Sequence, residues 1–323
     1  MTGTVKQARS ADEIGALIDK LSTSIERAIL GKRDVIDRVL TALLSRGHLL
    51  IEDIPGVGKT TMAQALARSI NCSFKRVQFT SDLLPSDILG VKVFEPASGE
   101  FKFVQGPIFN SIVLADEINR TTPRTQSAFL EAMSEAQVTI EGDTFSLPAP
   151  FMVIATENPI EHHGTYALPD SQLDRFLMSV SMGYPPRDDE KRILTENVLD
   201  PSGESFGHVM EADEVVALQS AVDGVRLSSE VADYILELVG ATRQSKGLRL
   251  GASPRGSLAL RQVAKASALM DGRDFTIPDD VKKNTVSVLA HRVIPSGAIP
   301  PDEKRKVAKD IVEDIVETVS APL

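Results

Sequence analysis

A glycine-rich segment near the start of the chain has the residue types needed to bind phosphate groups. Residues 53–60, with the sequence DIPGVGKT, follow the apolar run 48–51 and precede a helix-forming stretch. In such a unit the N–H groups of the loop and the positive end of the helix dipole point at one place. Lys59 can reach the outer phosphates and the Thr60 hydroxyl can bind Mg²⁺, which predicts a nucleoside triphosphate site. The residues expected around the phosphates are Pro55, Gly56, Val57, Gly58, Lys59, Thr60 and Thr61.

Asp53 stands where the strict form of this motif has glycine. The tight turn depends on Gly56 and Gly58, and aspartate tolerates an unusual backbone conformation better than most residues. We therefore expect the loop to bind phosphate with Asp53 in place. The alternative is that residues 58–60 only begin a helix.

A second segment ends in two adjacent carboxylates. Residues 111–117, with the sequence SIVLADE, are a short apolar strand of the kind that forms the Walker B element in ATPases. Asp116 can hold Mg²⁺ together with Thr60, and Glu117 can polarise the attacking water. The alternative is a strand followed by solvated acids. The order of the two segments and their separation, about one crossover connection, favour the nucleotide site.

Composition predicts a large soluble protein rather than a membrane or nucleic-acid protein. The chain has 323 residues, 42% hydrophobic and 25% charged, which is enough for two domains. It has no apolar run long enough to span a bilayer and no signal-peptide core, so we expect a cytoplasmic location. The single cysteine, Cys72, fits a reducing compartment. A net charge of −10 makes nucleic acid an unlikely partner and favours protein partners.

The apolar patterns predict an α/β domain with a parallel five-stranded sheet. Apolar spacing typical of helices and short β-type segments alternate along the first half of the chain, which implies a parallel sheet with helices on both faces. The expected helices are 11–29, 34–46, 59–70 and 122–135, and the expected strands are 48–51, 75–79, 111–115, 151–155 and 176–182.

Two further segments predict β-hairpins inserted into this pattern. Residues 91–94 and 100–103 alternate apolar and charged side chains around a turn, and 137–140 and 144–147 do likewise. The hairpins could cover the edges of the sheet or line a pore, and the sequence does not favour either.

The prolines in residues 184–190 mark an expected domain boundary, because they oppose both a helix and a central strand. We predict a nucleotide-binding core with N-terminal helices over residues 1–185 and a smaller all-α lid over 186–323. The expected lid helices are 187–199, 211–221, 228–245, 255–271, 278–291 and 301–318.

The order of these segments resembles that of AAA+ ATPases, and within them the MoxR family, over nearly the whole chain. The matching blocks are Gly31 with its apolar neighbours and residues 55–60, 115–120, 126–135, 155–159, 164–166, 173–176 and 251–255. The resemblance implies a P-loop core with hairpin insertions followed by a helical lid. It also places adenine near Ile29, Leu30 and Gly31. The chain lacks an Asn-Lys-x-Asp guanine signature, which favours ATP over GTP.

The resemblance also implies roles for three residues. Asn158 matches the sensor-one position, where an amide holds the attacking water, although an Asn-Pro turn is the alternative. Arg175 matches the arginine finger that reaches the nucleotide of the neighbouring subunit, the alternative being a salt bridge to a local acid such as Asp174. Arg255 matches the sensor-two arginine and could serve its own site or a neighbour's. The adjacent histidines 162 and 163 leave the common pattern, and we interpret them as a solvent-facing loop rather than a metal site.

Membership of this family would imply a ring, expected to be a hexamer, that uses ATP and Mg²⁺ to remodel or mature client proteins. A partner with a von Willebrand factor A domain is expected alongside it. The alternatives are the motor subunit of a metal chelatase, a nucleic-acid motor or transcriptional activator, and a non-enzymatic nucleotide switch. The net charge of −10 and the lack of a Gly-Ala-Phe-Thr-Gly-Ala loop disfavour the nucleic-acid motor. The sequence does not identify the client.

Overall fold

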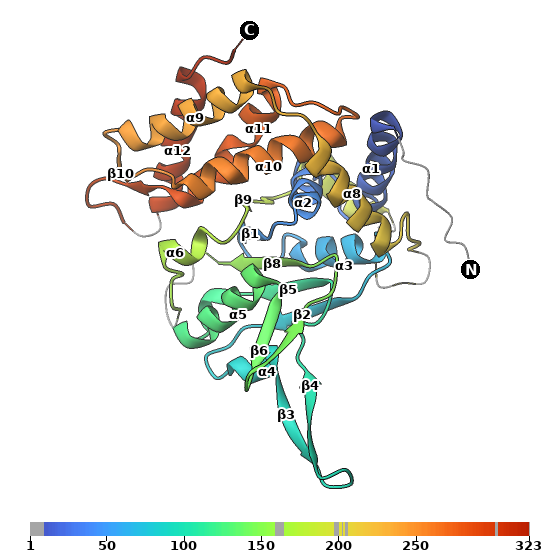
Figure 1. The fold of residues 1–323 in the computed structure, drawn as a ribbon. Helices are drawn as coiled ribbons and strands as arrows, with labels where there is room; N and C mark the ends of the chain where they lie inside the picture. Colours follow the sequence, from blue (N-terminus) through green and yellow to red (C-terminus); the bar gives the residue numbers. More distant parts are fainter. Residues whose placement is uncertain are drawn as a thin grey trace.

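A parallel five-stranded sheet forms the centre of the N-terminal half, as the sequence predicts (Figure 1). The computed structural model describes residues 10–158, 165–196, 200–201, 203, 206–300 and 303–322. The strands are β1 (Leu49–Glu52), β2 (Phe74–Gln78), β5 (Ile112–Asp116), β8 (Met152–Glu157) and β9 (Met178–Val180), in the order β2-β5-β8-β1-β9. All four pairings are parallel, so the carboxyl ends of the strands meet at one edge.

Helices cover both faces of this sheet because its inner strands are apolar on both sides. Ile112 and Leu114 of β5 face one hydrophobic cluster, and Val113 faces the other. The first face carries α1 (Ala11–Glu26), α2 (Arg33–Leu44) and α3 (Lys59–Ser69); the second carries α4 (Pro85–Leu89) and α5 (Pro123–Glu135). The N-terminus of α5 is capped as expected, since the Thr122 side chain accepts a hydrogen bond from Thr125 N.

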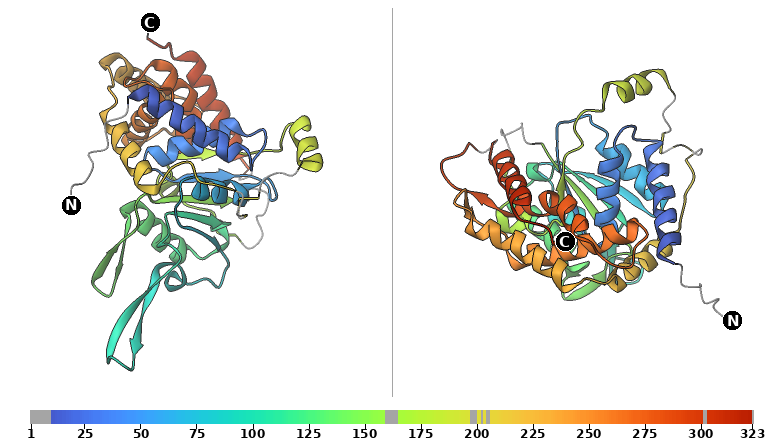
Figure 2. Two further views of the ribbon diagram at one scale, coloured as in Figure 1. Left: turned by 90° about the vertical axis from the view of Figure 1, so that its right-hand side faces the viewer. Right: turned by 90° about the horizontal axis from the view of Figure 1, so that it is seen from above.

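The two predicted hairpins are present and lie outside the central sheet. They are β3 (Gly90–Glu95) with β4 (Glu100–Gln105), and β6 (Gln137–Ile140) with β7 (Asp143–Ser146); each forms its own two-stranded sheet. The β3–β4 hairpin projects away from the body of the subunit (Figures 1 and 2). In the described part of the chain neither hairpin pairs with an edge strand of the central sheet.

The C-terminal half is helical. It contains α7 (Arg187–Thr195), α8 (Ala212–Gly224), α9 (Ser229–Gln244), α10 (Pro254–Met270), α11 (Pro278–Leu289), the 3₁₀ turn η2 (Ala290–Arg292) and α12 (Lys304–Thr318). A short antiparallel ribbon of β10 (Leu248–Leu250) and β11 (Ile294–Pro295), which the sequence did not predict, interrupts the helices. Among the described residues no helix is long and apolar enough to cross a membrane.

The helical half packs directly on the N-terminal helices. One hydrophobic cluster contains residues of α1 and α2 together with residues of α8, α10 and α11. Helix α7 is the exception, because none of its residues is buried and it stands apart from the body (Figure 2). The boundary after residue 185 therefore stays a prediction, since the two parts share a core.

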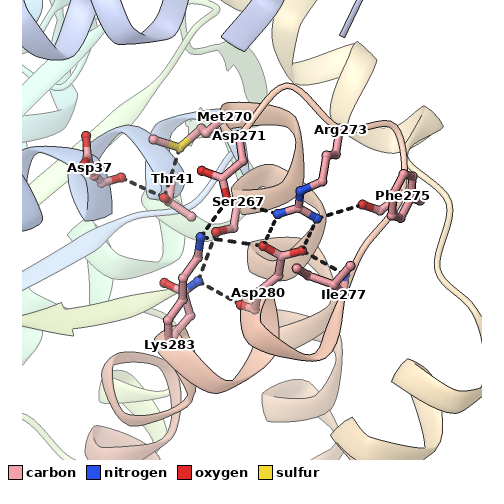
Figure 3. Close-up of polar contacts among 11 residues, drawn as sticks. Asp37, Thr41, Ser267, Met270, Asp271, Arg273, Phe275, Ile277, Asp280 and Lys283 are labelled. Atoms are coloured by element: carbon pink, nitrogen blue, oxygen red, sulfur yellow. Dashed lines mark hydrogen bonds and ion pairs between the residues drawn. The ribbon is translucent and has the colours of Figure 1, made fainter. Parts of the chain in front are cut away.

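A polar cluster fixes the turn between α10 and α11, next to α2 (Figure 3). Asp280 is fully buried and accepts two hydrogen bonds from the Arg273 guanidinium, at 2.7 and 2.8 Å. The same carboxylate accepts a hydrogen bond from Ile277 N at 2.9 Å and so caps α11. From the α2 side, the Thr41 hydroxyl reaches Met270 Sδ at 3.2 Å.

We predict that Asp280→Ala lowers the free energy of unfolding by about 3 kcal/mol, because it leaves the half-buried Arg273 guanidinium without its main partner and removes the cap of α11. Urea denaturation measures this change. The matched control is Asp274→Ala, which removes an exposed ion pair with Arg226 and should cost less than about 1 kcal/mol. Equal effects of the two substitutions would contradict the prediction.

Candidate nucleotide-binding site

The glycine-rich loop joins the end of β1 to the start of α3. Gly56 and Gly58 have φ angles of +85° and +93°, which residues with a Cβ rarely adopt. Lys59 is the first residue of α3, and its ammonium group donates a hydrogen bond to Asp53 O at 2.9 Å. Burial lowers the pKa of Lys59, against the attraction of Asp116, Asp53 and Glu117. The structure therefore brings the lysine of the first motif near the acids of the second.

Asp53 has a structural role that the sequence did not reveal. Its φ is not among the positive values, so conformational tolerance is the wrong explanation for this residue. Instead the buried carboxylate accepts hydrogen bonds from Met182 N and Gly183 N, both at 2.6 Å, and from the Ser181 hydroxyl at 3.0 Å. Its other oxygen accepts from Ile54 N at 2.8 Å. Asp53 thus ties the phosphate loop to the segment after β9.

The region predicted to hold adenine borders the same segment. Lys32 donates hydrogen bonds to Met182 O at 2.5 Å and Tyr184 O at 2.7 Å. Gly31 has a φ of +68°, and a Cβ there would lie 2.2 Å from a carboxylate oxygen of Asp189 on α7. Glycine at this position therefore lets α7 approach the residues that precede α2.

The two acids of the second motif lie at the end of β5 and are held by a threonine of β8. The Thr156 hydroxyl donates to Asp116 Oδ1 at 2.7 Å and accepts from Glu117 N at 2.9 Å. Glu117 adopts a left-handed backbone conformation, with φ of +56°, where the chain turns into η1 (Ile118–Arg120). Its carboxylate also pairs with Arg120, at 3.1 Å.

Two residues of the neighbouring edge strand β2 contact these acids, and the sequence analysis missed both. Arg76 pairs with Asp116 Oδ2 at 2.5 Å, and the Gln78 amide donates to Glu117 Oε2 at 2.7 Å. Gln78 lies opposite Asp116 in the parallel register. The only signal in the sequence is two polar residues on one face of a strand, which is too common to assign a role.

Asn158 follows β8 directly and is buried. It therefore lies at the same edge of the sheet as Asp116 and the phosphate loop. Residues 159–164, which include His162 and His163, are outside the described part of the chain, so the expectation of a solvent-facing loop is not tested.

The two predicted arginines contact residues other than the phosphate loop and the two acids. Arg175 donates to Leu130 O at 3.2 Å and to the Ser134 hydroxyl at 3.0 Å, both on α5. The alternative of a salt bridge to Asp174 is wrong: Asp174 pairs with Arg292 at 2.9 Å and with Arg255 at 3.7 Å. Arg255 thus reaches the residue next to Arg175.

The side chains at the loop fit a magnesium–nucleotide complex. Thr60 supplies a hydroxyl and Asp116 a carboxylate, and Mg²⁺ prefers one or two protein oxygen ligands together with substrate phosphates. The described residues include no group of three or more His, Cys, Asp or Glu side chains placed to hold a metal by themselves. Thr60 and Asp116 stay the predicted magnesium ligands.

We predict that Asp53→Gly, which restores the strict motif, weakens nucleotide binding and lowers stability. It would leave the N–H groups of Met182 and Gly183 without an acceptor, at about 1–3 kcal/mol for each buried group. Thermal unfolding and titration with a fluorescent ADP measure the two effects. Ser98→Ala, which removes an exposed hydroxyl that bonds Glu95 in the β3–β4 hairpin, is the control. Tighter binding by the glycine variant would refute the role of the carboxylate.

Comparisons with known proteins agree with this geometry. The ATPase family associated with various cellular activities (AAA) matches residues 48–178, and the AAA lid domain matches residues 240–315. The chain is 45% identical to the Bacillus subtilis protein YeaC over 97% of both chains. It is 37% identical to chaperone MoxR1 of Mycobacterium tuberculosis, over 94% of this chain and 82% of that one.

A solved structure shows the same fold. The crystal structure of a protein from Cytophaga hutchinsonii, described there as a candidate ATPase, superposes with a TM-score of 0.85 at 33% identity and covers 97% of both chains. Together with the matched core and lid, these relatives show that the chain belongs to the MoxR family of AAA+ ATPases and is an ATP hydrolase.

Proposed function

We propose that this chain is the subunit of a ring, most simply a hexamer, that hydrolyses ATP to remodel or mature client proteins. The observation that carries this proposal is the separation of the two halves of the predicted catalytic set. The phosphate loop and the acids converge at the carboxyl end of the parallel strands, whereas Arg175 precedes β9 at the amino end, where it contacts α5 and Arg255 contacts the adjacent Asp174. Such a subunit gains a complete site when a second copy supplies the arginines.

Within one subunit, each residue of the site has a distinct task. Lys59 and the N–H groups of the loop bind the outer phosphates, and Thr60 and Asp116 hold Mg²⁺. When bound, magnesium–ATP supplies the phosphoryl group and a positive charge that balances its oxygens. Glu117 orients and polarises the attacking water with the help of the Asn158 amide. Because Glu117 is bonded to Gln78 and Arg120 in this structure, it has to exchange one of these contacts for water.

The arginine pair would serve the neighbouring subunit. Arg175 keeps one guanidinium nitrogen on α5, which fixes the direction of a side chain that has to cross an interface. Arg255 approaches the adjacent Asp174, so we assign both arginines to the same neighbouring site. Helix α7 offers further contact area, since Ile193 and Leu194 are exposed on it.

The two hairpins are the candidates for client contact. Phe94 and Phe101 pair with each other and are exposed on β3 and β4. The hairpins touch through Phe103 and Phe145, whose rings stack at 4.1 Å, and through Lys92 and Asp143, at 2.7 Å. Chaperone MoxR1, a relative, supports a protein client. A cytoplasmic location and a partner with a von Willebrand factor A domain complete the proposal.

The function is tested by a variant that holds ATP without hydrolysing it. We expect Glu117→Gln to bind ATP with near-normal affinity and to lose ATPase activity by at least about 100-fold, because the water loses its base. Affinity capture with this variant in ATP should then retain client proteins and a von Willebrand factor A domain protein. Lys59→Met, which should not bind nucleotide, is the control.

Retention of chelatase subunits or nucleic acid by Glu117→Gln in place of such proteins would overturn the remodelling function. Unchanged steady-state hydrolysis by this variant would instead contradict the role of Glu117. The two failures are separate, because the first leaves the ATPase assignment in place.

The shared site predicts a non-linear response when subunits are mixed. We expect Arg175→Ala, added to wild type at a fixed total concentration, to depress ATPase activity below the line for simple dilution, because each variant subunit disables its neighbour. Arg255→Ala should behave in the same way. The exposed Arg249→Ala is the control and should leave activity unchanged. A linear decrease with Arg175→Ala would show that each subunit is complete by itself.

A further inference from the structure

Two glutamates end adjacent strands directly before the residues of the ATP site. Glu52 is the last residue of β1 and precedes the phosphate loop, and Glu157 is the last residue of β8 and precedes Asn158. They are partners in the parallel register, so their side chains leave the same face of the sheet. Two carboxylates in this arrangement repel each other and the phosphates that bind nearby.

The ionisation of Glu157 reflects its burial first and this repulsion second. Burial, reinforced by the charge of Glu52, raises the pKa of Glu157 to about 7, while Arg305 acts in the opposite direction. The Glu52 carboxylate is also stabilised by a residue of β9, because one of its oxygens accepts a hydrogen bond from the Ser179 hydroxyl at 2.7 Å. Among the described residues, the cation that faces both acids is Arg305.

Arg305 comes from the lid, about 250 residues away from Glu52 in the sequence. It lies in the first turn of α12, and its Nε is 2.7 Å from Glu52 Oε1. The same guanidinium donates to His291 O in η2 at 3.4 Å. The side chain therefore connects the lid to the strand that leads into the phosphate loop.

A second arginine attaches the same lid turn to the core. Arg292 in η2 pairs with Asp174 and donates to Leu177 O at 2.9 Å and Phe176 O at 2.6 Å. Helix α12 packs against η2, which Arg292 attaches to the core. This anchoring holds Arg305 in place against the end of β1.

We propose that Arg305 is a positioning residue for ATP binding and hydrolysis: it neutralises Glu52 and Glu157 and fixes lid helix α12 to the strand ends that carry the phosphate loop and Asn158. The inference rests on the proposed function of this loop. Without the guanidinium, two uncompensated carboxylates would stand beside the site for a polyphosphate. The competing explanation is an exposed ion pair that contributes little to stability or binding.

The test compares nucleotide affinity in charge-balanced and unbalanced variants of the full chain, with a fluorescent ADP as the probe. We expect Arg305→Met to weaken binding by about tenfold, the effect of one uncompensated charge near the phosphates. The double variant Arg305→Met/Glu157→Gln should recover to within about threefold of wild type, because the second change removes the like charge. Lys306→Met, the next residue on α12 and exposed, is the matched control and should bind as wild type does.

The single variant Glu157→Gln provides an independent check, since it removes a repulsive charge and should fold even if Arg305→Met does not. We expect it to bind ADP at least as tightly as wild type. Weakened binding by Glu157→Gln, unchanged binding by Arg305→Met, or a double variant as weak as Arg305→Met would each overturn the inference. If the wild-type protein does not bind ADP, that result contradicts the proposed function, and the inference about Arg305 is then wrong as well.

Discussion

The parallel register of the central sheet brings several acids to the edge where a polyphosphate has to bind. Strands β1, β5 and β8 end together, and each ends in a carboxylate: Glu52, Asp116 and Glu157. An anion site lined by acids needs compensating donors. The surrounding structure supplies them to Asp116 from β2 and to Glu52 from the lid. The catalytic arrangement depends on this local balance of charge.

The compensating groups come from different parts of the chain, so the same contacts also hold the architecture together. The Asp53 carboxylate accepts hydrogen bonds from N–H groups that follow β9, and the Asp174 carboxylate forms an ion pair with Arg292 of the lid. Asp53 and Asp174 therefore each join two elements that are distant in sequence. A displacement of the lid changes the electrostatics of the strand ends, which gives a physical route from domain movement to nucleotide affinity.

The sequence predicts the elements of this fold better than the contacts between them. The strands and hairpins are recognised because apolar runs and alternation are local signals, and the cap at Thr122 is local as well. The roles of Asp53, Arg76 and Arg305 depend on residues up to about 250 positions away, for which no local pattern exists. The short helix α6 (Asp170–Leu173) and the β10–β11 ribbon were missed because each is only a few residues long.

Helix α5 connects the arginine edge of the subunit to the hairpins. The two residues that bind Arg175, Leu130 and Ser134, lie in the last two turns of α5, and β6 begins two residues after the helix ends. The β6–β7 hairpin in turn contacts β3–β4 through the stacked Phe103 and Phe145. If the proposed movement of Arg175 toward a neighbouring nucleotide carries α5 with it through these hydrogen bonds, both hairpins would be displaced as well. The proposed ring can therefore couple the state of one site to the hairpins of the next subunit through a single helix.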